Sequence, residues 1–136
     1  MFSINAQCEA LIAAGKTYPG AVLFGSTLSL TLCKFAQDQA DYQALHQQQG
    51  HQHWDERKSI IESVICQNVE EICAESWPID HYGTDESIAK DILWSWEQSP
   101  GHWSVVAVDH SLYGVGMAMG SNNIVYATIQ AVCPLH

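Results

Sequence analysis

Positive charge is the scarcest feature of this sequence: five Lys and Arg residues stand against fifteen Asp and Glu, which gives a formal net charge of −10 over 136 residues. A surface of this sign repels phosphate backbones, so the composition excludes nucleic acid as a partner. It also disfavours binding to anionic membrane surfaces. We therefore expect a protein, a small molecule or a lipid as the partner.

Long apolar runs are also missing. The longest are far too short to cross a bilayer, and the stretch 10–32 is broken by glycine and proline. Residues 1–7 lack the basic segment, the apolar segment and the small-residue cleavage site of a signal peptide. We predict no transmembrane segment and no signal peptide, which fits synthesis in the cytoplasm.

The cysteines exclude a metal finger and a disulfide scaffold, because their number is odd and no two have C-x-x-C spacing. The five are Cys8, Cys33, Cys66, Cys73 and Cys133. We expect buried free thiols that act as small hydrophobic side chains. A disulfide between Cys66 and Cys73 is the alternative in an oxidising compartment.

The length fits a single domain, and the spacing of apolar residues predicts an α+β fold. We expect Gly50 to cap the first helix, Ile60 and Ile61 to face inward in the second, and Thr84 to begin the third, which stops at Pro100. The tryptophans near that stop are expected in the core, with a surface aromatic platform for sugar or peptide as the alternative: Trp94, Trp96 and Trp103. The predicted helices span 28–49, 55–63 and 85–98, the strands 112–118 and 124–132 with a hairpin turn between them, and residues 64–77 are irregular or strand-like.

Three motifs follow one another in the C-terminal half of the chain. Residues 96–102 carry W-x-x-S-P-G-H at the end of a predicted helix, residues 114–118 carry G-V-G-x-A, and residues 126–130 form an aromatic-led strand segment. Upstream, Glu71 lies in a segment similar to G-E-N-I-A, with Glu70 as the alternative register. On these residues the chain resembles the CAP superfamily of cysteine-rich secretory, antigen 5 and pathogenesis-related proteins, and within it the bacterial-type members.

The resemblance implies a CAP-type α/β/α sandwich, an α+β fold with a small antiparallel sheet between helices. The CAP (SCP-like) domain would span residues 28–136, and residues 1–27 would be an N-terminal segment packed on it. Members of the family line a cavity with two histidines and two glutamates, which in some members bind a divalent cation such as zinc.

The family's cavity residues are partly present here. Carried over residue by residue, the second histidine is His102 and the first glutamate is Glu71. Residues 36–40 resemble the family's A-x-x-H-(S/A) segment, so the first histidine position holds Gln39. The second glutamate position holds Ser99. The resemblance therefore implies a cavity with two of the four family ligands.

A metal site would need more ligands than His102 and Glu71, because zinc takes three or four N, S or O ligands. His51 is the third ligand that we expect, with His53 in the same loop as the alternative. Without a metal, we expect His102 to hydrogen-bond the turn that follows the proline and Glu71 to accept from the backbone or from Gln39. The predicted cavity lining is Gln39, His51, Glu71, Ser99 and His102.

The function that we expect is a CAP binding module that presents its cavity and loops to a partner in a larger extracellular or virion assembly. A virion component released by lysis would reconcile a family that is usually extracellular with the missing signal peptide. One alternative is a metal-assisted hydrolase in which His102 and Glu71 act as general acid and base. The other is lipid or sterol binding, as the resemblance implies for some members.

Overall fold

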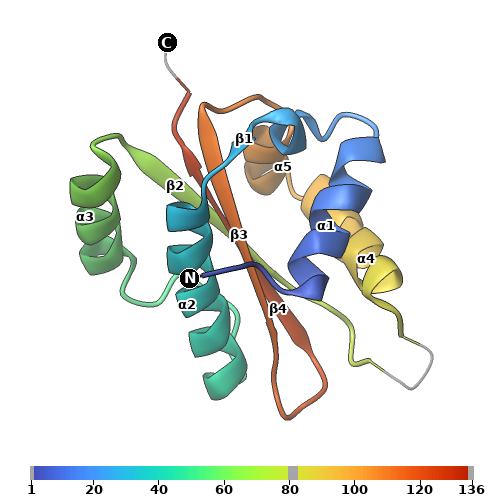
Figure 1. The fold of residues 1–136 in the computed structure, drawn as a ribbon. Helices are drawn as coiled ribbons and strands as arrows, with labels where there is room; N and C mark the ends of the chain where they lie inside the picture. The colour runs from blue at the N-terminus through green and yellow to red at the C-terminus, as the bar shows by residue number, and fades with distance from the viewer. Residues whose placement is uncertain (1, 80–82, 135–136) are drawn as a thin grey trace.

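Helices cover both faces of a four-stranded sheet in the computed structural model, which describes residues 2–79 and 83–134 (Figure 1). Helices α2 and α3 lie on one side of the sheet, and α1, α4 and α5 lie on the other, so the predicted α+β sandwich is confirmed. In chain order the elements are α1 (Ala6–Thr17), the 3-10 helix η1 (Val22–Gly25), β1 (Thr27–Leu28), α2 (Leu30–His46), α3 (Trp54–Ile65), β2 (Val69–Glu75), α4 (Asp85–Glu97), α5 (Pro100–Val106), β3 (Leu112–Met119) and β4 (Val125–Val132). Within the described residues, none of these helices combines the length and the apolar character that a membrane span requires.

The sheet has the strand order β1-β3-β4-β2. The long strand β4 pairs antiparallel with β3 and with β2, as the hairpin pattern predicted for β3 and β4. The two-residue strand β1 pairs parallel with β3, so the sheet is mixed rather than purely antiparallel. Strand β2, which lies within the segment predicted as irregular or strand-like, forms one edge of the sheet.

Helix α2 packs directly on the backbone of β3. Gly114 and Gly116 lie two residues apart and so share the strand face that meets this helix. A Cβ atom at Gly114 would lie 2.3 Å from the Leu32 carbonyl carbon, and one at Gly116 would lie 2.3 Å from the Gln37 amide nitrogen. Because no side chain fits at these positions, the two glycines set the distance between α2 and the sheet.

The opposite face of the sheet carries the main apolar core. Fully buried Trp96 of α4 lies there, and its indole Nε1 donates to the Cys73 carbonyl oxygen of β2 at 3.0 Å. Trp96 thereby satisfies an outward-facing backbone group of the edge strand, which is otherwise open to pairing with another chain. Other buried members of this core are Cys8, Leu11, Phe24, Ile72, Ala74, Ile92, Leu93, Val106, Val115, Met117 and Ile129.

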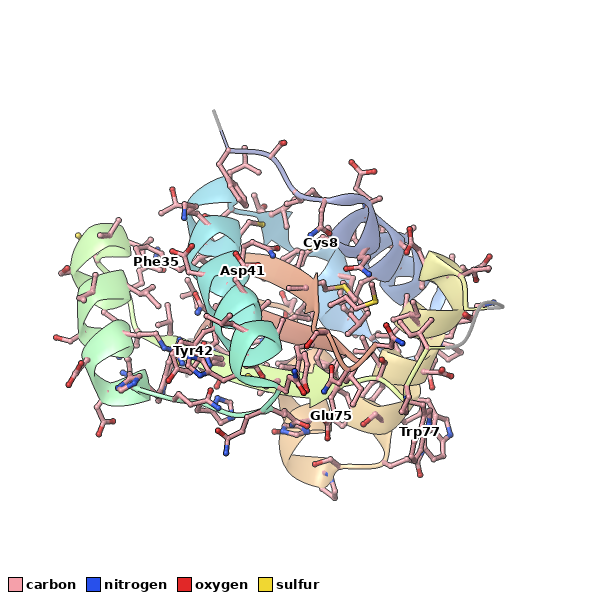
Figure 2. The ribbon with its side chains drawn as sticks, turned by 90° about the horizontal axis from the view of Figure 1, so that it is seen from below. Cys8, Phe35, Asp41, Tyr42, Glu75 and Trp77 are labelled. Atoms are coloured by element: carbon pink, nitrogen blue, oxygen red, sulfur yellow. The ribbon has the colours of Figure 1, made fainter. Side chains whose placement is uncertain are left out.

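A smaller apolar cluster fills the space between α2, α3 and the sheet, where Phe35 projects toward α3 (Figure 2). Its buried members are Leu32, Ile61, Val69 and Val132. Ile61 is inward as predicted, but Ile60 is 57% exposed and that part of the prediction is wrong. Neighbouring residues of a helix point about 100° apart, so one narrow cluster accepts one of the two.

Helix α4 begins as the sequence predicts. The Thr84 hydroxyl accepts from the Ser87 amide at 3.1 Å, and the Ser87 hydroxyl accepts from the Thr84 amide at 3.0 Å, which is a capping box. The helix ends at Glu97, so the predicted stop before Pro100 is confirmed, but Pro100 is also the first residue of a further helix, α5, which was not predicted. Proline is tolerated there since the first helical N–H has no intrahelical partner.

Two further details differ from the sequence prediction. Helix α2 ends at His46, because Gln47 rather than Gly50 takes the left-handed capping conformation, with φ at 52°. Trp96 is buried as predicted, but Trp94 is 54% exposed. Trp103 is half-buried and packs edge to face on the ring of Tyr18, with centroids 6.0 Å apart.

The cysteines follow the predicted pattern in part. Cys8, Cys33 and Cys73 are buried, whereas Cys66 is exposed and Cys133 is half-buried. All five are free thiols, so Cys66 and Cys73 are not joined by a disulfide. The buried thiols fill space in the core, as small hydrophobic side chains do.

We expect Gly116→Ala to lower the free energy of unfolding by about 3 kcal/mol, because the new Cβ meets helix backbone that cannot move aside. Gly25→Ala is the matched control: no atom lies within 4 Å of the added Cβ there. Urea denaturation followed by circular dichroism measures both. Equal stabilities of the two variants would contradict the close packing of α2 on β3.

Candidate functional site

A buried carboxylate lies on the edge strand β2: the side chain of Glu71 has 0% exposure. It points toward α2 and α3, because its neighbour Ile72 belongs to the core of the other face and strand residues alternate. Directly opposite on β4 is its register partner Gln130. Glu70, the alternative register of the sequence motif, points to the other face, and its side chain is 34% exposed.

Four hydrogen bonds from nitrogen donors occupy the carboxylate of Glu71, and the Cys73 thiol donates a longer one to Oε1 at 3.7 Å. Its Oε2 accepts from Arg57 Nη1 at 2.7 Å and from Gln130 Nε2 at 2.9 Å. Its Oε1 accepts from Arg57 Nη2 at 2.9 Å and from His51 Nδ1 at 2.9 Å. A carboxylate has about four lone-pair sites, and a bidentate guanidinium is among its strongest partners. The hydrogen-bonding capacity of Glu71 is therefore fully used.

These contacts keep Glu71 ionised although it is buried. Burial alone would raise the pKa of Glu71, but the hydrogen bonds from Arg57 and His51, the positive charge of Arg57 and the bond from Gln130 together hold the pKa below its ordinary value. An ionised carboxylate only accepts hydrogen bonds, so His51 donates to it from Nδ1.

Arg57 is fixed on its other sides as well. Its Nε donates to the Gln52 carbonyl oxygen at 2.9 Å, and its guanidinium carbon lies 5.1 Å from the centre of the Trp54 ring. Both partners belong to the start of α3 or to the loop before it. The guanidinium therefore joins helix α3, the 47–53 loop and the edge strand.

Gln39, which was expected to donate to Glu71, binds this loop instead. The side chain is 2% exposed, and its Nε2 donates to the Gly50 carbonyl oxygen and to Gln52 Oε1, both at 2.8 Å. The Gly50 amide in turn donates to Gln43 Oε1 at 3.0 Å. The expected bond from Gln39 to Glu71 is not formed, since Arg57, His51 and Gln130 supply the donors.

His102 lies in α5, which packs on α4 at the sheet face opposite to the Glu71 carboxylate. Burial and, second, the charge of His51 lower the pKa of His102. The expected hydrogen bond from His102 to its turn is absent from the described part of the chain. Ser99 is the N-cap residue of α5, and its side chain makes no capping bond.

Three metal-ligating atoms gather in this cluster, all within 4.8 Å of one another: they belong to His51, Glu71 and Cys73. Cys73 was not predicted as a ligand, and His102 is outside this group. Two features work against a metal here. Arg57 occupies both oxygens of Glu71, and burial followed by the nearby charge of Glu71 raises the pKa of the Cys73 thiol, which disfavours the thiolate that a metal needs. His53 instead packs edge to face on a tyrosine ring of α2.

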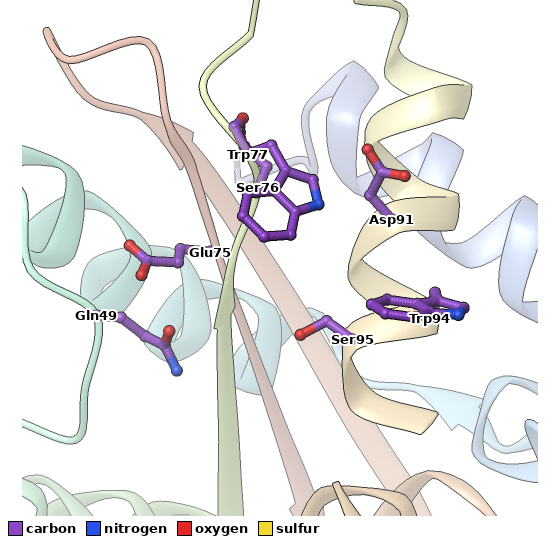
Figure 3. A pocket seen from close by; sticks show the side chains of 7 residues that line it. All are labelled: Gln49, Glu75, Ser76, Trp77, Asp91, Trp94 and Ser95. Atoms are coloured by element: carbon purple, nitrogen blue, oxygen red, sulfur yellow. Dashed lines mark hydrogen bonds between the residues drawn. The ribbon is translucent and has the colours of Figure 1, made fainter. Parts of the chain in front are cut away.

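A second candidate site is a hollow of about 250 Å³ at the end of β2, which we call the Trp77–Trp94 hollow (Figure 3). It is lined by Gln49, Glu75, Ser76, Trp77, Asp91, Trp94 and Ser95. Trp77 is 71% exposed and Trp94 is 54% exposed. Figure 3 shows Trp94, Ser95 and Asp91 on helix α4, and Glu75 and Gln49 on the opposite side. In Figure 2, Trp77 projects from the body of the molecule.

Sequence reasoning preferred a core position for Trp94 and gave the exposed aromatic surface only as the alternative, so it did not predict this hollow. The signal was present: Ile88, Ile92 and Trp96 form the apolar stripe of α4, and Trp94 lies two residues from either neighbour in that stripe. Two residues rotate a helical side chain by about 200°, which turns Trp94 outward. Trp77, next to Pro78 and just beyond β2, gave no periodic pattern from which its exposure follows.

Comparisons with known proteins bear on the fold. No family model matches the chain, and no curated protein matches its sequence. Among solved structures, an outer surface protein from Borrelia burgdorferi superposes with a TM-score of 0.70 at 16% sequence identity, over 98% of this chain and 97% of that chain. At this identity the likeness shows a shared fold over the full length.

We expect Glu71→Gln to lower the free energy of unfolding by about 3 kcal/mol, because the partly buried Arg57 charge loses its partner. Glu56→Gln removes the same charge from an exposed position beside Arg57 on α3 and should change stability by less than about 0.5 kcal/mol. Urea denaturation at neutral pH compares them. A Glu71→Gln variant as stable as the control would contradict the structural role of the ion pair.

The same pair predicts a pH dependence. The folded-state pKa of Glu71 is lower than its ordinary value of 4.5, so its stabilising contribution is complete above that value and is lost as pH falls through the folded pKa. The difference in unfolding free energy between wild type and Glu71→Gln should therefore shrink steadily below about pH 4.5. Denaturation series from pH 6 to pH 3 measure it, and a difference that stays constant would count against an ionised Glu71.

Proposed function

We propose that this chain is a CAP-type binding module rather than a hydrolase. The three motifs that carry the resemblance fall on consecutive elements of an α/β/α sandwich: α4 to α5, β3 and β4. We favour the binding module over the hydrolase because hydrogen bonds from protein groups occupy both oxygens of the Glu71 carboxylate.

A hydrolase would need Glu71 to exchange a proton with substrate or to bind a metal. General acid and base groups must reach the proton that they transfer, and metal ligands need a free lone pair. Glu71 has neither while Arg57 binds both of its oxygens. His102 also makes no hydrogen bond to Glu71 in the described residues, so the pair lacks the contact that an acid and base would share.

In the proposed function the Glu71 cluster is the support of a binding surface. It holds the 47–53 loop through His51 and through the Gln52 carbonyl bound by Arg57. Gln49 of this loop donates to the Cys73 carbonyl oxygen at 3.4 Å and lines the Trp77–Trp94 hollow. The buried cluster thus sets one wall of the hollow.

The ligand surface that we propose is the Trp77–Trp94 hollow itself. Ligand sites combine aromatic surface with a few polar groups that fix orientation, and this hollow has two exposed indoles, two carboxylates, an amide and two hydroxyls. Exposed tryptophans are costly to leave in water and are frequent at binding sites.

The setting that we propose is a larger extracellular or virion assembly. The structural neighbour is described as an outer surface protein, which supports a fold that meets its partners outside the cell. Lipid or sterol binding is a different use of the fold, and it would employ an apolar surface such as the shallow hollow lined by Phe2, Leu30, Thr31, Lys34, Phe35 and Val64.

Nuclear magnetic resonance tests the proposal through the five tryptophan indole N–H signals, assigned by single substitutions. The probes are a capped arginine-containing pentapeptide, chitotriose, dodecylphosphocholine below its micelle concentration, and zinc chloride. We expect one of the three organic probes to shift the Trp77 and Trp94 signals and leave that of buried Trp96 unchanged. The Trp94→Ala variant should lose the response.

Three results would overturn the binding-module proposal. The first is that no organic probe shifts either signal. The second is a response confined to the Trp54 signal, because Trp54 and Phe35 pack against the same small apolar cluster and the ligand would then lie near the apolar hollow that Phe35 lines. The third is stoichiometric zinc at His51 and His102 together with hydrolytic activity that Glu71→Gln abolishes.

A further inference from the structure

We propose that the Trp77–Trp94 hollow binds a basic peptide segment, with an arginine or lysine side chain held between the two indoles and the carboxylates of Glu75 and Asp91. The inference rests on the proposed function, because it names the ligand class of the same hollow. It depends on the charge, the aromatic surface and the shape of the groove.

The negative charge of the hollow favours a positively charged ligand. Glu75 and Asp91 are both exposed, and no lysine or arginine is among the residues that line the hollow. Among the described residues, neither carboxylate has an ion-pair partner. The chain as a whole carries a net charge of −10, so its field attracts positive ligands and repels anionic ones.

The exposed indoles of Trp77 and Trp94 also favour a positively charged ligand. A guanidinium or ammonium group over an indole face is stabilised by the ring quadrupole, and tryptophan is the best of the aromatic side chains for this contact. The protein already uses the contact internally, where Arg57 lies 5.1 Å from the Trp54 ring centre. A cation in the hollow would meet Trp77 or Trp94 with a carboxylate beside it (Figure 3).

The surface offers room for more than one side chain of a ligand. A second hollow of about 240 Å³ adjoins the first and shares Ser76, Trp77 and Asp91 with it. Its further lining is Pro78, Ile79, Gly83, Ser87 and Ile88. Two adjacent hollows suit two side chains of an extended peptide that point the same way, which are residues i and i+2.

The walls of this groove are held in place. Ser76 Oγ accepts from the Val125 amide at 2.9 Å, and the Ile79 amide donates to the Asn123 carbonyl oxygen at 2.7 Å. The opposite wall is helix α4, fixed by its buried face. A groove that is formed before the ligand arrives avoids much of the entropic cost of ordering it.

The test is calorimetric titration of the full chain with a capped pentapeptide, Gly-Arg-Ser-Leu-Gly, which places arginine and leucine at i and i+2. The matched probe replaces arginine by citrulline, which keeps the shape and removes the charge. We expect the arginine peptide to bind at least about tenfold more tightly than the citrulline peptide, as a cation over tryptophan beside a carboxylate predicts. Raising salt from 0.05 to 0.5 M should weaken the arginine peptide selectively, by an amount on the order of severalfold.

The variants locate the site. Trp94→Ala should weaken the arginine peptide by about tenfold, and Asp91→Asn should remove most of the preference over citrulline. Glu56→Gln and Val64→Ala, which change an exposed charge and an exposed apolar side chain outside the groove, should bind like wild type. Thermal melting confirms that each variant is folded.

Equal affinity for the arginine and citrulline peptides, or no binding of the arginine peptide up to about 10 mM, a very weak affinity, would overturn the inference. Chitotriose shifting the Trp77 and Trp94 signals while the peptide does not would also overturn it, yet would leave the binding-module proposal intact. Arginine-peptide binding that survives both Trp94→Ala and Asp91→Asn would place the ligand elsewhere and likewise contradict it.

Discussion

The buried ion pair between Glu71 and Arg57 is the constraint on which the rest of this site depends. Removing both charges from water costs several kcal/mol per ion, so such a pair persists where geometry and further hydrogen bonds offset that cost. Here the guanidinium is bidentate, and His51 and Gln130 complete the carboxylate. Because the four residues come from β2, α3, the 47–53 loop and β4, the pair fixes how these segments meet.

The oxygens of Glu71 orient His51 and Arg57. Gln39 likewise holds the loop backbone at Gly50. What remains open to a ligand lies outside the cluster, at the end of β2, where two exposed indoles and two carboxylates border the Trp77–Trp94 hollow. In the proposed function, the buried charges provide rigidity and the exposed ones provide recognition.

Local patterns in the sequence predicted most of the fold. The Thr84 cap, the apolar stripe of α4 and the alternation of β4 are properties of neighbouring residues, and all are present. Helix α5 was not predicted, because a proline can follow the end of one helix as readily as it can begin another. The site was harder to predict, because Arg57 and Glu71 are 14 residues apart in the sequence. No local sequence pattern around either residue predicts their contact. The Trp77–Trp94 hollow was predictable in part, because Trp94 lies outside the apolar stripe of α4. The exposure of Trp77 depends on the direction that the chain takes after β2, which no sequence pattern predicts.

The ionisation state of Glu71 tests the account most directly. In protein labelled with carbon-13 at the glutamate carboxyl groups, the Glu71 signal is identified by its absence in a variant and followed from pH 7 to pH 2.5. A structural carboxylate with four donors should titrate below the ordinary glutamate value of 4.5. A midpoint above that value would mean a protonated, incompletely bonded Glu71, and with it a cavity available for acid, base or metal chemistry.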